Sequence, residues 1–170
     1  ATTDRLTLDP SMVDKQLRVV ISYTDNGGFY EQINSSATAA ILNINDQPIG
    51  RPDINGSSEQ GQTLSVDVSR IQDLDGLGAF SYQWLANGVA IQNADGSTFA
   101  PTQAEVGTTL SVRVGYTDGQ NTSESITSLA TDDIENRNDV PTGEIKIQGI
   151  EKEGETLTVD SSGIDDADGF

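Results

Sequence analysis

The residues best suited to chemistry in this chain are aspartates and asparagines in three short segments. These are Asn43-Ile44-Asn45-Asp46-Gln47-Pro48, the predicted loop Asp73-Leu74-Asp75-Gly76, and the pair Asp118-Gly119. Calcium takes six to eight hard oxygen ligands at flexible geometry, and carboxylate, amide and backbone oxygens all supply them. We therefore predict calcium ligands at Asn43, Asn45, Asp46, Asp73, Asp75 and Asp118.

The same segments recur 93 residues further along the chain. Tyr23-Thr24-Asp25 recurs as Tyr116-Thr117-Asp118, and the segment from Asn43 to Pro48 recurs as Asn136-Arg137-Asn138-Asp139-Val140-Pro141. The loop motif also recurs at this offset, which needs no gap anywhere, and such self-similarity predicts tandem repeats. The offset places a second set of calcium ligands at Asn136, Asn138, Asp139, Asp166 and Asp168.

The offset also divides the chain. We predict one complete repeat at 48–140, the C-terminal half of a preceding repeat at 1–47, and the N-terminal part of a following repeat at 141–170. We interpret the chain as a piece of a longer protein. Either outer segment alone leaves apolar strand faces and open edges, so we expect self-association through these segments or incomplete order.

Period-two alternation of apolar residues predicts short strands throughout the complete repeat. In chain order, we predict strands at 51–55, 63–69, 80–86, 89–91, 97–100, 110–116 and 123–130. Asn87-Gly88 has the residues of a type I′ hairpin turn. About seven short strands with one tryptophan on the third predict an all-β fold, an immunoglobulin-like β-sandwich. Trp84 is interpreted as a core residue, in preference to a platform for sugar stacking.

The predicted sandwich would gather the ligand segments. In such a fold the loops after the second and sixth strands lie at the end where the first strand begins. We therefore expect Asn45, Asp46, Asp73, Asp75 and Asp118 to converge on one ion. The alternative is a set of polar turns beside a linker with no metal, because Asp and Gly are also ordinary turn residues.

The composition of the chain argues against several classes of function. Twenty-seven acidic residues against nine lysines and arginines give a formal charge of −18, and histidine and cysteine are absent. An acidic surface repels phosphate backbones and anionic lipids, so we expect neither nucleic acid binding nor membrane insertion. Without histidine and cysteine there is no Ser–His triad, thiol nucleophile or disulfide framework. We expect a protein that is not an enzyme.

The junction segments resemble the Asp-x-Asn-Asp-x-x-Pro linkers of cadherins, where oxygen atoms hold calcium between successive domains. They resemble still more the Asn-Asp-x-Pro junctions of large repeat adhesins and RTX-type surface proteins of Gram-negative bacteria. The chain departs from cadherins at Asn43 and Asn136, which replace Asp, and in a spacing to proline that is one residue shorter.

This resemblance implies a secreted cell-surface protein of cell adhesion and biofilm formation. The chain would be a non-catalytic extender whose linkers are stiffened by Ca²⁺ and whose partners are neighbouring repeats of the same chain. The sequence leaves open the host or surface ligand of such a protein. Two alternatives also stay open, namely a glycan- or peptide-binding module and an accessory domain of a secreted hydrolase.

Overall fold

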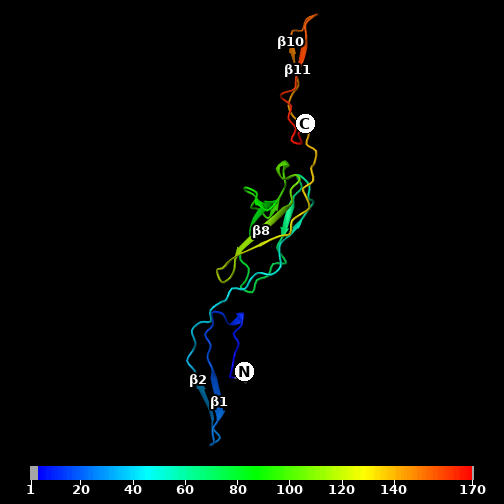
Figure 1. Cartoon of the computed structure of the whole chain (residues 1–170). Helices are drawn as coiled ribbons and strands as arrows, with labels where there is room; N and C mark the ends of the chain where they lie inside the picture. Colours follow the sequence, from blue (N-terminus) through cyan, green and yellow to red (C-terminus); the bar gives the residue numbers. More distant parts are fainter. Residues whose placement is uncertain (1–3, 170) are drawn as a thin grey trace. The chain divides into compact units, whose positions relative to one another are not determined.

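The computed structural model describes residues 4–169 and shows an all-β chain, drawn in Figure 1. Residues 1–3 and Phe170, which belong to the predicted outer segments 1–47 and 141–170, lie outside the described part. The chain forms two compact units, each assembled from separated stretches of sequence. The first unit comprises Ala1–Gly50, Ile71–Phe80 and Gly115–Glu124, and the second comprises Arg51–Arg70, Ser81–Val114 and Ser125–Phe170.

The first unit contains an antiparallel hairpin of β1 (Val20–Thr24) and β2 (Tyr30–Asn34), visible in blue in Figure 1. The 3₁₀ helix η1 (Pro10–Met12) precedes the hairpin. Both strands are exposed along their whole length. The apolar side chains of this hairpin therefore face solvent.

The second unit contains most of the remaining strands, and β8 and β9 have residues in both units. One antiparallel sheet has the order β3 (Asp53–Asn55), β4 (Leu64–Asp67), β7 (Thr98–Phe99). A second sheet has the order β6 (Val89–Ala90), β5 (Ser81–Ala86), β8 (Leu110–Thr117), β9 (Ser123–Thr127). The 3₁₀ helix η2 (Gln103–Glu105) precedes β8, and β10 (Lys146–Gly149) pairs with β11 (Leu157–Asp160). The seven strands β3 to β9 lie where the sequence predicts them.

The core of the second unit follows from alternation along β8. Leu110, Val112 and Val114 are fully buried, whereas Arg113 between them is exposed. Successive side chains of a strand point to opposite faces, so the apolar face of β8 is turned to the interior, where Leu64 of β4 is fully buried as well. Removal of each such side chain from water stabilises this unit by about 1.5–3 kcal/mol relative to the open chain.

Trp84 of β5 lies in the same core. Its side chain is fully buried, its Nε1–H donates to the Gly96 carbonyl at 2.9 Å, and its ring centroid is 5.6 Å from that of Phe99. A buried indole with its N–H satisfied is a packing residue. The core interpretation of Trp84 is confirmed, because no sugar can stack on it there.

The turn between β5 and β6 matches its sequence. Asn87 and Gly88 have φ values of 48° and 81°, and the hairpin pairs Ala86 with Val89 across this two-residue loop. Left-handed φ at both central residues defines the type I′ turn, whose twist suits a hairpin. The predicted turn type is confirmed.

The 93-residue offset of the sequence recurs in local hydrogen bonds. Leu17 N–H donates to Thr38 Oγ1 at 3.0 Å, and Leu110 N–H donates to Thr131 Oγ1 at the same distance. The 3₁₀ helices η1 and η2 are related by the same offset. Corresponding sequences therefore fold alike locally in both units.

Among residues 4–169, no helix is both long and apolar enough to cross a lipid bilayer.

Candidate functional site

Two loops of the first unit touch because glycines leave room for them. Gly119 N–H donates to the Asp75 carbonyl at 3.0 Å, and a Cβ on Gly119 would lie only 2.6 Å from that oxygen. A Cβ on Gly78 would overlap with the Thr117 carbonyl oxygen. Only glycine permits approaches this close. The loop after β4 and the turn after β8 are thereby held side by side.

The segment that precedes β3 is tied to the same loops. Asp46 N–H donates to Asp75 Oδ2 at 2.8 Å, and Asn45 Nδ2 donates to Glu124 Oε1 at 2.7 Å. Ile49 and Gln72 exchange backbone hydrogen bonds of 2.8 and 3.0 Å. Linker, loop and strand end therefore meet in one group of side chains. We call this group the first acidic cluster and define it as Asn45, Asp46, Asp73, Asp75, Tyr116, Asp118 and Glu124.

Asp73 connects the loop to β8. Its Oδ1 accepts the Asp75 N–H at 2.8 Å, which closes the turn, and its Oδ2 accepts the Tyr116 hydroxyl at 2.6 Å. Phe80 supports Tyr116 from the side, with ring centroids 5.6 Å apart in an edge-on arrangement. The phenol is thus fixed between an apolar ring and a carboxylate.

The pKa of Tyr116 is affected by its burial and by the negative charges near it. Burial raises the pKa of the Tyr116 phenol well above its ordinary value, and the hydrogen bond to Asp73 raises it further. The negative charges of Asp73, Glu124 and Asp118 act on this pKa in the same direction. Three carboxylates from three elements of the chain therefore act on one hydroxyl.

Asp118 is the most deeply buried acid of the first acidic cluster, with a relative exposure of 5%. Its Oδ1 accepts N–H groups from Gln120 and Thr122 at 2.8 and 2.7 Å, while its buried Oδ2 has no hydrogen-bond partner. The ion pair of Arg70 with Asp53 involves none of these carboxylates. A buried carboxylate oxygen without a partner is costly, and a cation would satisfy it.

The cluster contains five of the six predicted ligands of this junction. The structure links Asn45, Asp46, Asp73, Asp75 and Asp118 through hydrogen bonds and charge interactions, and their convergence on one ion stays a prediction. It places Asn43 elsewhere, at a hollow of about 300 Å³ that this residue lines with Leu8, Asp9 and Ile41. Asp46 lines this hollow too, and it also lines a second one with Asp73.

Two members of the cluster, Tyr116 and Glu124, were not predicted as site residues. Both recur at the 93-residue offset, as Tyr23 and Glu31. These two face each other in the register of β1 and β2. Recurrence of a glutamate opposite a tyrosine was the signal that could have found them, but it requires the strand register.

The predicted ligands of the other junction lie in the second unit and repeat part of the pattern. Asp139 N–H donates to Asp168 Oδ2 at 2.8 Å, and Asp168 N–H donates to Asp166 Oδ1 at 2.9 Å. These bonds are the counterparts of those from Asp46 to Asp75 and from Asp75 to Asp73. Asn136 and Asn138 are exposed, and the Asn138 amide donates to the backbone carbonyl of Asp139.

Gln60 was not predicted at this second junction. Its Nε2 donates to Asp139 Oδ2 at 2.8 Å, and its Oε1 accepts the Arg137 N–H at 3.1 Å. An uncharged amide has no distinctive motif in the sequence. Only the fold shows that Gln60 holds the linker in place.

Glu105, at the end of η2, is buried but engaged locally. Its Oε2 accepts the N–H and the hydroxyl of Thr102, both at 2.8 Å, which forms a capping box. The role of Glu105 shown by these bonds is to cap this short helix.

The chemistry of the first acidic cluster fits calcium in its donor type. Carboxylate and carbonyl oxygens are the ligands that this ion prefers, and the unpartnered Asp118 Oδ2 is an open acceptor. In the part of the chain that the structure describes, no three carboxylates are gathered as a finished metal centre. Several of the oxygens accept backbone N–H groups instead. A bound ion would therefore require side chains of the cluster to turn.

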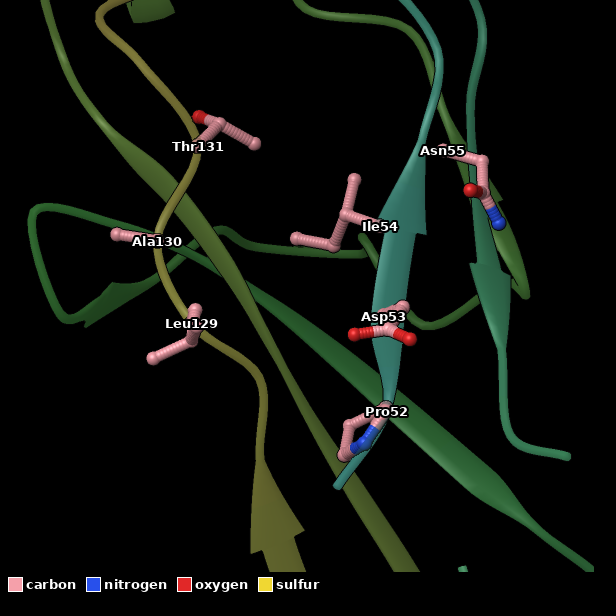
Figure 2. A pocket seen from close by; sticks show the side chains of 7 residues that line it. All are labelled: Pro52, Asp53, Ile54, Asn55, Leu129, Ala130 and Thr131. Carbon is pink, nitrogen blue, oxygen red and sulfur yellow. The ribbon is translucent and has the colours of Figure 1, made fainter. Parts of the chain in front are cut away.

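A different hollow, between β3 and the segment after β9, offers less chemistry. Figure 2 shows Ile54 pointing toward the segment that carries Leu129 and Thr131. Asp53 is the charged residue of this hollow, and its Oδ2 is 2.9 Å from the Arg70 guanidinium. With its carboxylate paired, the hollow has no unpaired charge to bind an ion or move a proton.

The chain matches no protein-family model, no curated protein and no solved structure.

Proposed function

We propose that this chain is a stretch of a non-catalytic extender, built from immunoglobulin-like repeats in tandem and displayed on a bacterial surface after secretion. Calcium stiffens the junctions, so that the array projects adhesive modules away from the cell. One observation carries the proposal. The hydrogen bond from linker to loop, Asp46 to Asp75, recurs 93 residues later from Asp139 to Asp168 with the same atoms and the same 2.8 Å length.

The immunoglobulin-like part of the proposal rests on strand order and core. A three-stranded and a four-stranded antiparallel sheet, with a buried tryptophan on β5, are what such a sandwich requires. The recurring local hydrogen bonds support the same local fold at corresponding positions. These features favour tandem repeats over two unrelated domains.

The calcium part rests on charge. The negative charges of Asp73, Asp118 and Glu124 all act on the Tyr116 phenol, and the ion pair of Arg70 with Asp53 involves none of these three. Without a cation these carboxylates repel one another, which weakens the attachment of the linker. A bound calcium ion would be held by Asp73, Asp75, Asp118 and Glu124. By neutralising their charge, it would lock linker and loops together.

Calorimetric titration of the full chain with calcium tests this proposal. We expect heat of binding in the unmodified chain and at least a tenfold lower affinity in Asp73→Asn, because that change removes a ligand charge. Asp25→Asn is a control for the loss of one negative charge from a turn aspartate. Asp25 makes the same two turn hydrogen bonds as Asp118 but is exposed on the β1–β2 hairpin. Equal affinity of Asp73→Asn and the unmodified chain would contradict the proposed site.

A second candidate function is binding of a glycan or peptide by the β1–β2 hairpin. Phe29 and Tyr30 are 69% and 68% exposed, and Asp25 lies beside them in the turn. Exposed aromatic rings next to a carboxylate are suited to stacking and hydrogen bonding with a sugar. A glycan array probed with the chain and with Phe29→Ala and Tyr30→Ala separates this function from a purely structural role.

A further inference from the structure

Residues that correspond at the 93-residue offset differ sharply in burial. Val112 and Val114 of β8 are fully buried, whereas their counterparts on β1, Val19 just before the strand and Ile21 within it, are 61% and 60% exposed. The same contrast separates Leu64 of β4, which is fully buried, from Leu157 of β11, which is 50% exposed. The sequence specifies a core face at these positions, but on β1 and β11 that face is uncovered.

The second unit shows what covers such faces. Its stretch 58–66 hydrogen-bonds to stretches 97–101 and 135 through main-chain atoms. Gln60 N–H donates to the Glu135 carbonyl at 2.9 Å, and Glu135 N–H donates to the Ser58 carbonyl at 2.8 Å. Gly61 N–H donates to the Pro101 carbonyl at 2.8 Å. We call residues 58–66 the leading stretch and residues 97–101 with Glu135 the trailing stretch. These main-chain hydrogen bonds hold the leading stretch against the trailing stretch.

Two outer segments of the chain carry the same two stretches separately. At the 93-residue offset, the trailing stretch corresponds to residues in 4–47, which we call the N-terminal segment. The leading stretch corresponds to residues in 141–169, which we call the C-terminal segment. Each segment already has its own hairpin, β1–β2 or β10–β11. One copy of the chain therefore carries both halves of the arrangement, each in a separate segment.

We propose that the C-terminal segment of one copy of this chain docks on the N-terminal segment of a second copy. Each contact corresponds to one of the second unit. Residues of the leading stretch are replaced by those 93 positions later, and residues of the trailing stretch by those 93 positions earlier. Gly154 N–H then donates to the Leu8 carbonyl, and the main chain of Glu153 and Glu151 pairs with Leu42. Leu157 covers Val19 and Ile21. Leu8 and Leu42 are 49% and 84% exposed, which leaves them accessible to a partner.

This contact is heterologous, because a different surface is used on each copy. Such a contact leaves one free surface of each kind on every dimer and adds further copies head to tail. The stretch 78–93, which contains β5 and the buried Trp84 and Leu85, has no counterpart in either segment. We expect a synthetic peptide of residues 78–93, added to the chain, to strengthen the association by supplying that stretch.

Analytical ultracentrifugation of the full chain, in chelator so that calcium plays no part, tests the proposal. Two variants each block one surface, Val19→Asp/Ile21→Asp on the N-terminal segment and Leu157→Asp/Val159→Asp on the C-terminal segment. We expect the unmodified chain to grow beyond dimers with concentration and each variant alone to remain monomeric. An equimolar mixture of the two variants should give a one-to-one dimer and nothing larger, since each retains the surface that the other lacks.

Matched controls distinguish specific docking from nonspecific hydrophobic association. Val20→Asp changes an exposed residue of β1 whose counterpart, Arg113, is exposed as well. Thr156→Asp changes the counterpart of the exposed Thr63. Both controls should associate like the unmodified chain. A monomeric unmodified chain at every concentration overturns the proposal, as does self-association of a blocked variant on its own.

Discussion

Replacement of Asp118 by asparagine should raise the stability of the chain in chelator and reduce the additional stability that calcium provides. Asp118 is 5% exposed, and its Oδ1 accepts two backbone N–H groups while its Oδ2 accepts none. Asparagine has nearly the same shape and keeps the accepting oxygen. The substitution therefore removes one buried negative charge from the first acidic cluster and leaves the turn hydrogen bonds in place.

The magnitude follows from the unpartnered oxygen. A buried polar group without a partner costs about 1–3 kcal/mol, and a charged one costs more. The amide introduced by Asp118→Asn is neutral, so the cost of burying an unpaired charge is removed. In chelator we expect Asp118→Asn to raise the free energy of unfolding by about 1–3 kcal/mol. For a unit of 60–100 residues, each kcal/mol raises the melting temperature by about 4–8 °C.

Calcium should stabilise Asp118→Asn less than it stabilises the unmodified chain. A ligand at a hundred times its Kd stabilises the folded state by about 2.7 kcal/mol, whereas a tenfold weaker site gains about 1.4 kcal/mol at the same concentration. Calcium should therefore stabilise the unmodified chain about twice as much as Asp118→Asn.

Thermal and urea unfolding in chelator and in calcium measure both effects. Asp25→Asn again serves as the control, with little change in either condition, because Asp25 is exposed. The reasoning fails if Asp118→Asn is less stable than the unmodified chain in chelator and gains as much from calcium.

Three further predictions concern other residues of the core and the cluster. Trp84→Ala should lower the free energy of unfolding by about 3–5 kcal/mol in urea titrations, because removal of this fully buried side chain leaves a cavity. An effect below about 1 kcal/mol would contradict its core role. Gly119→Ala should reduce calcium affinity at least tenfold by calorimetry, because its Cβ would lie 2.6 Å from the Asp75 carbonyl oxygen and push the loops apart; unchanged affinity would show that the loops need not touch. Since the pKa of Tyr116 is raised in the folded state, its contribution to stability is complete below the ordinary tyrosine pKa of about 10 and is lost as the pH rises above it. Between neutral and alkaline pH, the melting temperature should fall less for Tyr116→Phe than for the unmodified chain. An equal fall in both would show that Tyr116 is not the group responsible.

Most strands could be predicted because one physical signal dominates them. Along β8, apolar residues alternate with polar ones, and this period of two places Leu110, Val112 and Val114 in the core. Asn87-Gly88 specifies its turn through the left-handed φ that these residues tolerate. Such signals are local, so they need no knowledge of the rest of the chain.

The cluster could be predicted only in part. Asp73, Asp75 and Asp118 are turn residues whose recurrence at one offset marks them, and their convergence follows from the sandwich expected for the strands. Glu124 is different, since it joins the cluster through the position at which β9 begins beside the linker. A shift of one residue in strand register would turn its side chain to the other face. The register depends on contacts that are distant in sequence.

Burial of the outer strands could not be predicted from the pattern alone. Ile21 and Val114 occupy corresponding positions with the same apolar character, yet one is exposed and the other buried. The alternation specifies which face of a strand is apolar. It does not specify whether another segment packs against that face. That information lies in the neighbouring stretch of chain or in a second copy.

Small-angle X-ray scattering of the full chain in calcium and in chelator tests the central claim most directly. Experiments should be run with the association surfaces blocked by Leu157→Asp/Val159→Asp, so that only monomers scatter. We predict a larger maximum dimension and a narrower distribution of shapes in calcium than in chelator, with a smaller difference for Asp73→Asn, in which only the second junction keeps all of its ligands. Identical scattering curves in calcium and chelator would contradict stiffening of the junction by this ion.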